Sequence, residues 1–164
     1  MNDHCPSVCP DYNLKFEILN PAQLFEKLDR QDVGGVYSIA LTNIHEALVH
    51  VGYVKEAPEV WTGEHLHVYV GESYSLKVRM GQHFGLDGEA SNFRTTLAMV
   101  LGMDDAATKR FLFDNAVIGW RYVDYMGDVE RDLIKRTACP LNLRGKGPSP
   151  FAKRLRILRR ASDG

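Results

Sequence analysis

The chain has 164 residues, 45% of them hydrophobic and 25% charged, which is the composition of one soluble globular domain with its own core. No apolar run approaches the roughly 20 residues that a membrane helix needs. The first residues also lack the basic and apolar stretches of a secretory signal. We therefore expect a cytoplasmic protein with no membrane-spanning segment.

The first half of the chain predicts one helix and a set of strands. Asn20 followed by Pro21 is typical of a helix start. Alternating polar and apolar residues from Leu66 onwards indicate a half-buried strand. The predicted segments, in order, are a tail over 1–20, a helix over 21–30, strands over 36–41 and 47–54, a polar loop over 55–65 and a strand over 66–71.

The second half predicts mainly helices. Ser91 can begin one of them and Gly102 can end it. The predicted segments are a helix from Ser73 or Ser75 to 84, helices over 91–102 and from Asp104, a strand over 117–123, and helices over 129–137 and 150–160. The fold class is therefore α+β (or α/β), with a small antiparallel or mixed sheet flanked by helices. We expect a single domain over 21–164.

The near-neutral net charge of −1 conceals a basic C-terminal end. Residues 131–164 hold 10 of the 20 Lys and Arg but only 2 of the 21 Asp and Glu. Cationic side chains supply most of the non-specific affinity for a phosphate backbone, so this segment permits a nucleic-acid partner. A solvated basic helix would have the same composition.

The three cysteines do not indicate a disulfide framework, because their number is odd. His4, Cys5 and Cys9 suggest a zinc site, but no second pair of ligands accompanies them, so a simple tail is favoured. Cys139 is expected to be a packed thiol.

Two tyrosine-centred triplets carry the first functional signal, Gly35-Val36-Tyr37 and Tyr69-Val70-Gly71. Arg79 and His83 follow, four residues apart on a predicted helix, so both project from the same face. Taken singly, strand tyrosines and an Arg/His pair are usually structural. Together they place two phenols near a permanent cation and a titratable ring.

A glutamate and an asparagine complete the set. Glu130 flanks the apolar stripe of a predicted helix, and one hard oxygen ligand at a core margin suits Mg²⁺ or Mn²⁺. Asn142 lies in Pro140-Leu141-Asn142, where its amide could hold a phosphate or brace the second shell of a metal. The alternative interpretations are that Glu130 is an ordinary exposed glutamate and that Asn142 only ends a helix in a turn.

In their order and spacing these residues resemble the GIY-YIG nuclease family, over roughly 35–145. The resemblance implies metal-dependent cleavage of DNA with Tyr37 as general base and Tyr69 as a partner of the phosphate or water. It further implies that Arg79 stabilises the phosphorane charge, that His83 orients Tyr37 or donates a proton, and that Glu130 binds the metal. Ser91 and Arg94 with Leu97 also resemble a Ser-x-x-Arg-x-x-Leu element of some bacterial members.

The chain departs from the family pattern at two places. Tyr37 and Tyr69 are separated by 32 positions, where the family usually has about a dozen, so an acidic insertion over 42–65 is predicted to extend the hairpin. Glu72 follows the second triplet, where an acid would repel a phosphate unless it turned away or bound a metal. A catalytically weak or inactive nucleic-acid-binding or scaffold module on the same fold is therefore the alternative.

The basic C-terminal end supplies the predicted contacts to the nucleic-acid backbone. These residues are Arg144, Lys146, Lys153, Arg154, Arg156, Arg159 and Arg160. No separate reader domain is visible, so specificity is expected from the insertion, the basic end, a homodimer or an unidentified partner.

Overall fold

The computed structural model describes residues 16–53, 61–62, 65–86, 88, 90–124, 126–136, 139–143 and 150–162. The described helices are α1 (Pro21–Arg30), α2 (His45–His50), α3 (Leu76–Phe84), α4 (Asn92–Leu101), α5 (Asp105–Asn115), α6 (Met126–Arg136) and α7 (Pro150–Ser162). None of these helices is long and apolar enough to cross a membrane.

Five strands form one sheet in the order β1-β5-β2-β4-β3. They are β1 (Glu17–Leu19), β2 (Gly35–Leu41), β3 (Trp61–Thr62), β4 (His65–Ser73) and β5 (Ala116–Arg121). Every pairing among them is antiparallel, and the central strand β2 is buried along its whole length. The fold is therefore α+β, as the sequence predicted.

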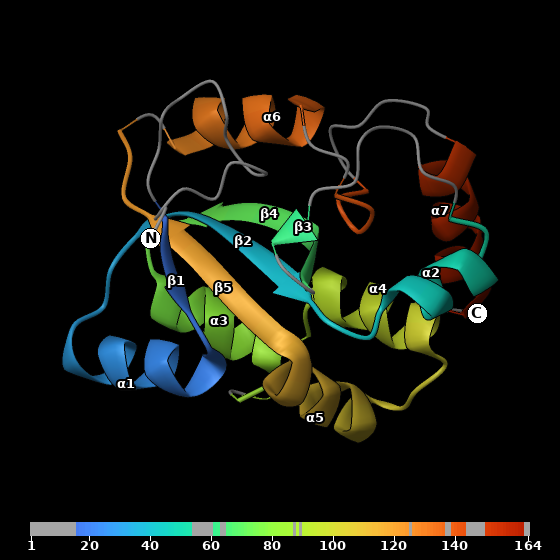
Figure 1. The fold of residues 1–164 in the computed structure, drawn as a ribbon, viewed down its shortest axis with the longest axis horizontal. Coiled ribbons are helices and arrows are strands. Elements are labelled where there is room, and N and C mark those ends of the chain that lie inside the picture. Colours follow the sequence, from blue (N-terminus) through green and yellow to red (C-terminus); the bar gives the residue numbers. More distant parts are fainter. Residues whose placement is uncertain are drawn as a thin grey trace.

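Helices cover both faces of this sheet (Figure 1). The helices α1, α3 and α5 lie on one face, where the larger core contains Tyr37, Ile39 and Phe84, and α6 packs on β2 and β4 from the other side. Successive residues of a strand point to opposite faces. Val36 therefore belongs to a separate, smaller core beneath α6.

The starts of α1, α3, α4 and α5 follow the predicted signals, whereas α6 begins three residues before the predicted 129. Asn20 accepts a hydrogen bond from the backbone N–H of Gln23, whose side chain accepts one from the backbone N–H of Asn20 in return. Ser75, Ser91 and Asp104 each accept a backbone hydrogen bond at the starts of α3, α4 and α5. These caps fix where each helix begins and so where its side chains point.

Two predicted segments were wrong. The run expected as a strand over 47–54 overlaps the helix α2, because Ile44 and Leu48, four residues apart, are both buried while Val49 is half exposed. That is the period of a helix and not the alternation of a strand. The end of the predicted 1–20 tail forms β1, which pairs with β5 and is too short to show a pattern in the sequence.

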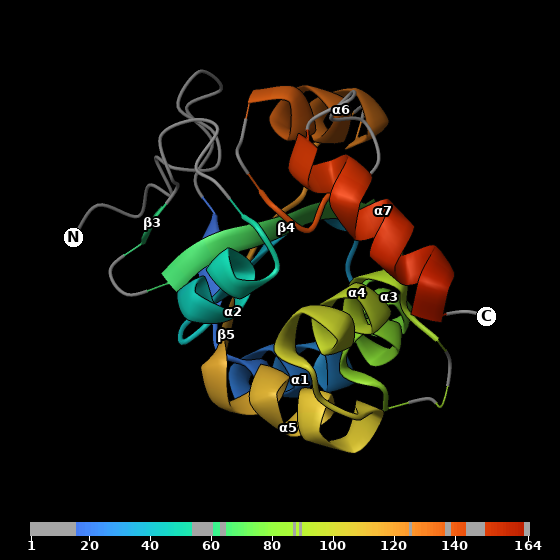
Figure 2. The same cartoon turned by 90° about the vertical axis from the view of Figure 1, so that its right-hand side faces the viewer.

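One edge of β4 is largely open. Among the described residues, β3 pairs only with His65 and Leu66 of β4, which leaves 67–73 without a strand neighbour on that side. Figure 2 shows α6 on one side of β4 and α3 and α4 on the other. Side chains from both layers can therefore meet at this edge.

Candidate active site

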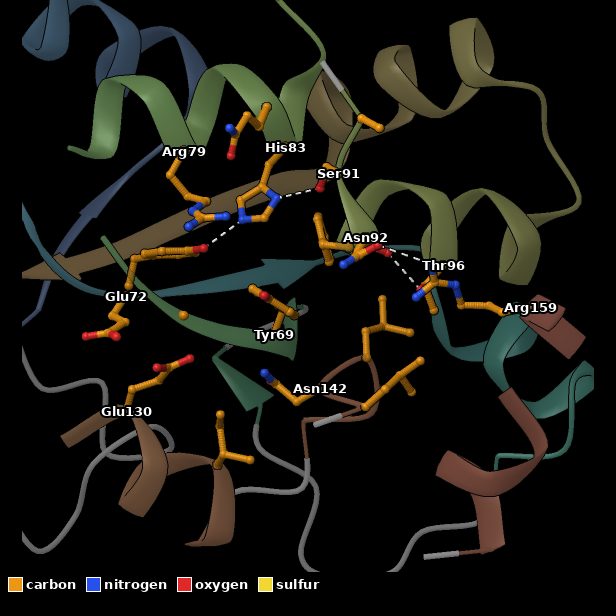
Figure 3. Close-up of a pocket in the computed structure, with 18 of the residues that line it drawn as sticks. Tyr69, Glu72, Arg79, His83, Ser91, Asn92, Thr96, Glu130, Asn142 and Arg159 are labelled. Carbon is orange, nitrogen blue, oxygen red and sulfur yellow. Dashed lines mark hydrogen bonds between the residues drawn. The ribbon is translucent and has the colours of Figure 1, made fainter. Parts of the chain in front are cut away.

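A pocket of about 740 Å³ lies along the open edge of β4. Its walls come from the C-terminal half of β4, from Tyr37 of β2, from α3, α4, α6 and α7, and from the turn at 141–143. All six predicted catalytic side chains line it, although they come from five parts of the chain: Tyr37, Tyr69, Arg79, His83, Glu130 and Asn142. Figure 3 shows this pocket with most of these residues labelled.

Tyr37 is at the centre of a buried chain of hydrogen bonds. Its hydroxyl lies 2.6 Å from Nε2 of His83, and Nδ1 of His83 lies 2.7 Å from Oγ of Ser91. Ser91 Oγ also accepts a hydrogen bond from the backbone N–H of Arg94, because Ser91 is the N-cap of α4. One serine therefore caps a helix and holds the histidine that contacts Tyr37.

The environment keeps both rings of this chain neutral. Burial, together with the charge of Tyr69, raises the pKa of Tyr37 well above its usual value. Burial and the nearby cations Arg79 and Arg94 lower the pKa of His83 to about 3. In the resting state His83 can therefore accept a proton at one nitrogen while it donates at the other.

The two triplets need their glycines for steric reasons. A Cβ atom at Gly71 would collide with the hydroxyl of Tyr37, so only glycine lets the phenol cross β4 to reach His83. Gly35 has a φ of +150°, and a Cβ atom there would collide with the carbonyl oxygen of Arg121. The glycines of the two triplets are thus required by close packing, whereas the tyrosines are the candidates for chemistry.

Tyr69 is half-buried beside this chain. Its ring centroid lies 5.5 Å from that of His83 and 5.0 Å from that of Phe93. Arg79 lies one helical turn before His83 on α3 and is exposed. Its guanidinium therefore faces the open part of the pocket, where an anion can reach it.

Two carboxylates lie at the same side of the pocket. Glu130 of α6 is half-buried, and its pKa is raised by burial and by the nearby charge of Glu72. The carboxylate of Glu72 points toward Gly127 in the first turn of α6, where a Cβ atom would lie 3.8 Å from both oxygens. The two carboxylates are thus close enough for the charge of Glu72 to affect Glu130.

This donor set fits a hard divalent cation. Mg²⁺ is usually held by one or two protein carboxylates and keeps several waters. The described residues contain no group of three or more His, Cys, Asp or Glu side chains that could hold a metal, so a fully protein-ligated site is not formed there. Glu130, with Glu72 near it, could provide the one or two oxygen ligands that a partly hydrated divalent cation needs.

Asn142 braces the strand that carries the second triplet. Its Oδ1 accepts from the backbone N–H of Val70 at 2.7 Å, and its Nδ2 donates to the carbonyl of Val70 at 2.8 Å. The backbone N–H of Leu141 donates to Val68. The Pro-Leu-Asn turn therefore takes the place of a neighbouring strand between Tyr69 and Gly71.

The predicted backbone-binding residues divide into three groups. Arg156 and Arg160 line the pocket, whereas Lys153 and Arg154 of the same helix are exposed elsewhere, and Arg144 and Lys146 lie outside the described residues. Arg159, a further predicted contact on this helix, also lines the pocket. Ser91 was predicted as a helix cap and as part of the Ser-x-x-Arg-x-x-Leu element, but its contact with His83 was not predicted.

The comparisons agree with this geometry. The family model described as the GIY-YIG catalytic domain matches residues 35–161, which is most of the chain and includes every residue of the pocket. No curated protein and no solved structure matches the chain. The chain belongs to the GIY-YIG nuclease family.

Proposed function

We propose that the protein is a metal-dependent endonuclease that hydrolyses phosphodiester bonds of DNA and leaves 3′-hydroxyl and 5′-phosphate ends. The observation that carries this proposal is the convergence of Tyr37, His83, Arg79 and Glu130 on one pocket in a chain of this family. Such hydrolysis needs a base, a cation for the developing charge and a fixed position for the phosphate. The pocket contains a candidate for each.

Arg79 is the candidate for charge stabilisation. Its exposed guanidinium can donate two parallel hydrogen bonds to phosphate oxygens. When the phosphate binds, it neutralises the charge of Arg79 that lowers the pKa of His83 in the empty pocket. Substrate binding would therefore make His83 a better proton acceptor.

Tyr37 and His83 together are the candidate base. As the water oxygen bonds to phosphorus, the water gives a proton to Oη of Tyr37, and Tyr37 gives its own proton to Nε2 of His83. This exchange avoids a buried phenolate, which the raised pKa of Tyr37 disfavours. The bond from phosphorus to the 3′ oxygen then breaks, and that oxygen takes a proton from solvent.

Glu130 would hold the divalent cation, with Glu72 positioned to assist. The cation would act as a Lewis acid that neutralises charge on the phosphate. The repulsion that Glu72 would exert on a substrate would be reduced in this arrangement, because its carboxylate lies near α6 and could help Glu130 to hold the cation.

The test is incubation of supercoiled plasmid and single-stranded DNA with the purified protein in Mg²⁺, Mn²⁺ or EDTA. The wild type is expected to cut only with a metal present. Glu130→Ala should lower the rate about 1,000-fold or more, since the cation is worth several kcal/mol to the transition state. Asp128→Ala is the matched control, because Asp128 is an exposed carboxylate on the same helix that pairs with Arg131.

An equal loss of cleavage rate in Glu130→Ala and Asp128→Ala would argue against a specific role for Glu130. If the folded wild type binds DNA but does not cut it in any metal, the result would support the alternative, a nucleic-acid-binding module without nuclease activity. That the protein needs a homodimer or a specificity partner stays a prediction. Cleavage of a plasmid by the isolated chain would show that neither is needed.

A further inference from the structure

The pocket has two chemically different ends. Figure 3 shows Glu72, Glu130 and Arg79 at one side and Arg159, with Asn92 and Thr96, at the opposite side. The pocket volume of about 740 Å³ is that of a site for a drug-sized molecule, which is larger than a single phosphate group. The catalytic side chains occupy only part of it.

Three arginines of α7 line the second end: Arg156, Arg159 and Arg160. Their spacing of three and four residues puts them on one face of the helix. Arg156 donates a hydrogen bond to the carbonyl of Leu143, and Arg159 donates one to Oδ1 of Asn92 at 3.2 Å. These bonds fix the orientation of both guanidinium groups at this end of the pocket.

Arg160 is the most accessible of the three. It is exposed at the rim, and no ion pair or hydrogen bond is assigned to it among the described residues. The carboxylates among the described lining residues are Glu72 and Glu130, and both lie at the other end. The α7 end is therefore a concentration of positive charge next to neutral side chains.

Arg154, on the same helix, lies elsewhere. It is exposed, and a Cβ atom placed on Gly52 would lie 3.1 Å from its guanidinium, so it packs near the end of α2 and not in the pocket. The helix thus directs some of its arginines to the active site and at least one away from it. The positive charge of α7 is therefore concentrated at the pocket by three of its arginines, and it is not spread evenly around the helix.

We propose that Arg156, Arg159 and Arg160 form a second anion site, which binds a backbone phosphate of the substrate strand next to the phosphate that is cut. The inference rests on the proposed nuclease function and specifies its substrate: a strand that continues beyond the cut past Tyr69 toward α7. The phosphate at α7 does not react. Its binding energy is the same in the ground state and the transition state, so it lowers KM and leaves kcat unchanged.

The first test measures binding of a fluorescent single-stranded DNA oligonucleotide in EDTA at several salt concentrations. Arg160→Ala should weaken binding about 5- to 10-fold and lower the slope of log K against log salt by about 0.7, the value of one phosphate contact on a single strand. Arg154→Ala removes the same charge from the same helix, but outside the pocket, and should change both quantities less than Arg160→Ala does. Equal effects of both variants, or no effect of Arg160→Ala, would overturn the proposal.

The second test uses cleavage in Mg²⁺. Arg160→Ala should raise KM about 5- to 10-fold with kcat within about 2-fold, whereas an arginine at the reacting phosphate would lower kcat. A fall in kcat equal to the fall in kcat/KM would overturn the assignment to a neighbouring phosphate. If no variant or wild type cuts DNA but the salt slope still falls for Arg160→Ala alone, the nuclease proposal fails and the second anion site stands.

Discussion

Tyr37 and Ser38 are neighbours on β2, and they point to opposite faces of the sheet. Each hydroxyl meets a buried histidine: Tyr37 lies 2.6 Å from His83, and Ser38 lies 2.7 Å from Nδ1 of His67. Burial lowers the pKa of His83 to about 3 and that of His67 to about 4. In burial, hydrogen bonding and protonation state the two pairs are alike.

The two histidines differ in what surrounds them. His83 lines a pocket that also contains Arg79 and Glu130, so an anion and a cation can bind next to it. His67 does not line that pocket, and after burial the main influence on its pKa is the charge of His65. A buried, hydrogen-bonded histidine is therefore no indication of catalysis unless charged groups face the same cavity.

The strongest test of this comparison removes each hydroxyl in turn. Tyr37→Phe should lower the cleavage rate about 100- to 10,000-fold, the usual contribution of a general base, while the ring continues to fill the core. Ser38→Ala should leave cleavage within about 2-fold. Rates are measured in single-turnover assays with the same DNA and metal.

Both variants take a hydroxyl from a buried histidine, so each should lose about 1–3 kcal/mol of unfolding free energy. Urea unfolding measures this cost and serves as the control for folding. If Tyr37→Phe cuts normally across the pH range, Tyr37 is not the base. If Ser38→Ala loses as much activity as Tyr37→Phe, the two pairs do not differ in the way the pocket suggests.

The sequence predicted side chains that line one pocket, but it did not predict the contacts between elements that distinguish the two histidines. Arg79 and His83 were placed on one helix face because helical spacing is short-range and regular. Ser91 was identified as a cap from its position, but its bond to His83 depends on how α3 packs against α4. Contacts between elements are set by tertiary packing, which periodicity does not encode.

The same limit explains the errors in the fold. The run over 47–54, which includes Leu48, was predicted as a strand, because a short apolar run cannot be assigned to a helix or a strand by pattern alone. The role of Asn142 was also beyond reach of the sequence. Its amide was expected at a phosphate or metal, and it pairs with the backbone of Val70 because the edge of β4 has no strand there.

We expect His67 and His83 to contribute similarly to the pH dependence of the unfolding free energy. Their pKa values in the folded protein lie below the unfolded value of about 6.5, so the unfolded chain binds more protons between these limits. Stability is therefore complete above about pH 6.5 and falls as the pH drops toward about 4 for His67 and about 3 for His83. The slope is at most about 1.4 kcal/mol per pH unit for each ring.

His67→Asn and His83→Asn should each flatten this slope by a similar amount in urea titrations between about pH 6.5 and 4. Cleavage at neutral pH should fall strongly in His83→Asn only. An unchanged slope in both variants would mean that the rings are solvated in solution. Loss of cleavage in His67→Asn without loss of folding would contradict the comparison of the two faces.

The smallest expected effect comes from Ser91, and it has a close match in Ser75. Both serines cap a helix by accepting a backbone hydrogen bond at 3.2 Å, so both Ser→Ala changes should cost about 1 kcal/mol. Only Ser91 also contacts His83. Ser75 instead donates to Asp32 on the surface.

Ser91→Ala should lower kcat about 3- to 10-fold and alter its pH profile, because Nδ1 of His83 loses the oxygen that fixes its tautomer. Ser75→Ala should lose the same stability and keep both kcat and its pH profile, and Ser91→Thr, which retains a hydroxyl, should restore most of the rate. Identical kcat values for Ser91→Ala and Ser75→Ala would reduce Ser91 to a cap. In that case Tyr37 alone would hold the productive tautomer of His83. The functional hydrogen bonds of His83 would then be reduced to its contact with Tyr37, the counterpart of the Ser38–His67 contact on the other face of the sheet.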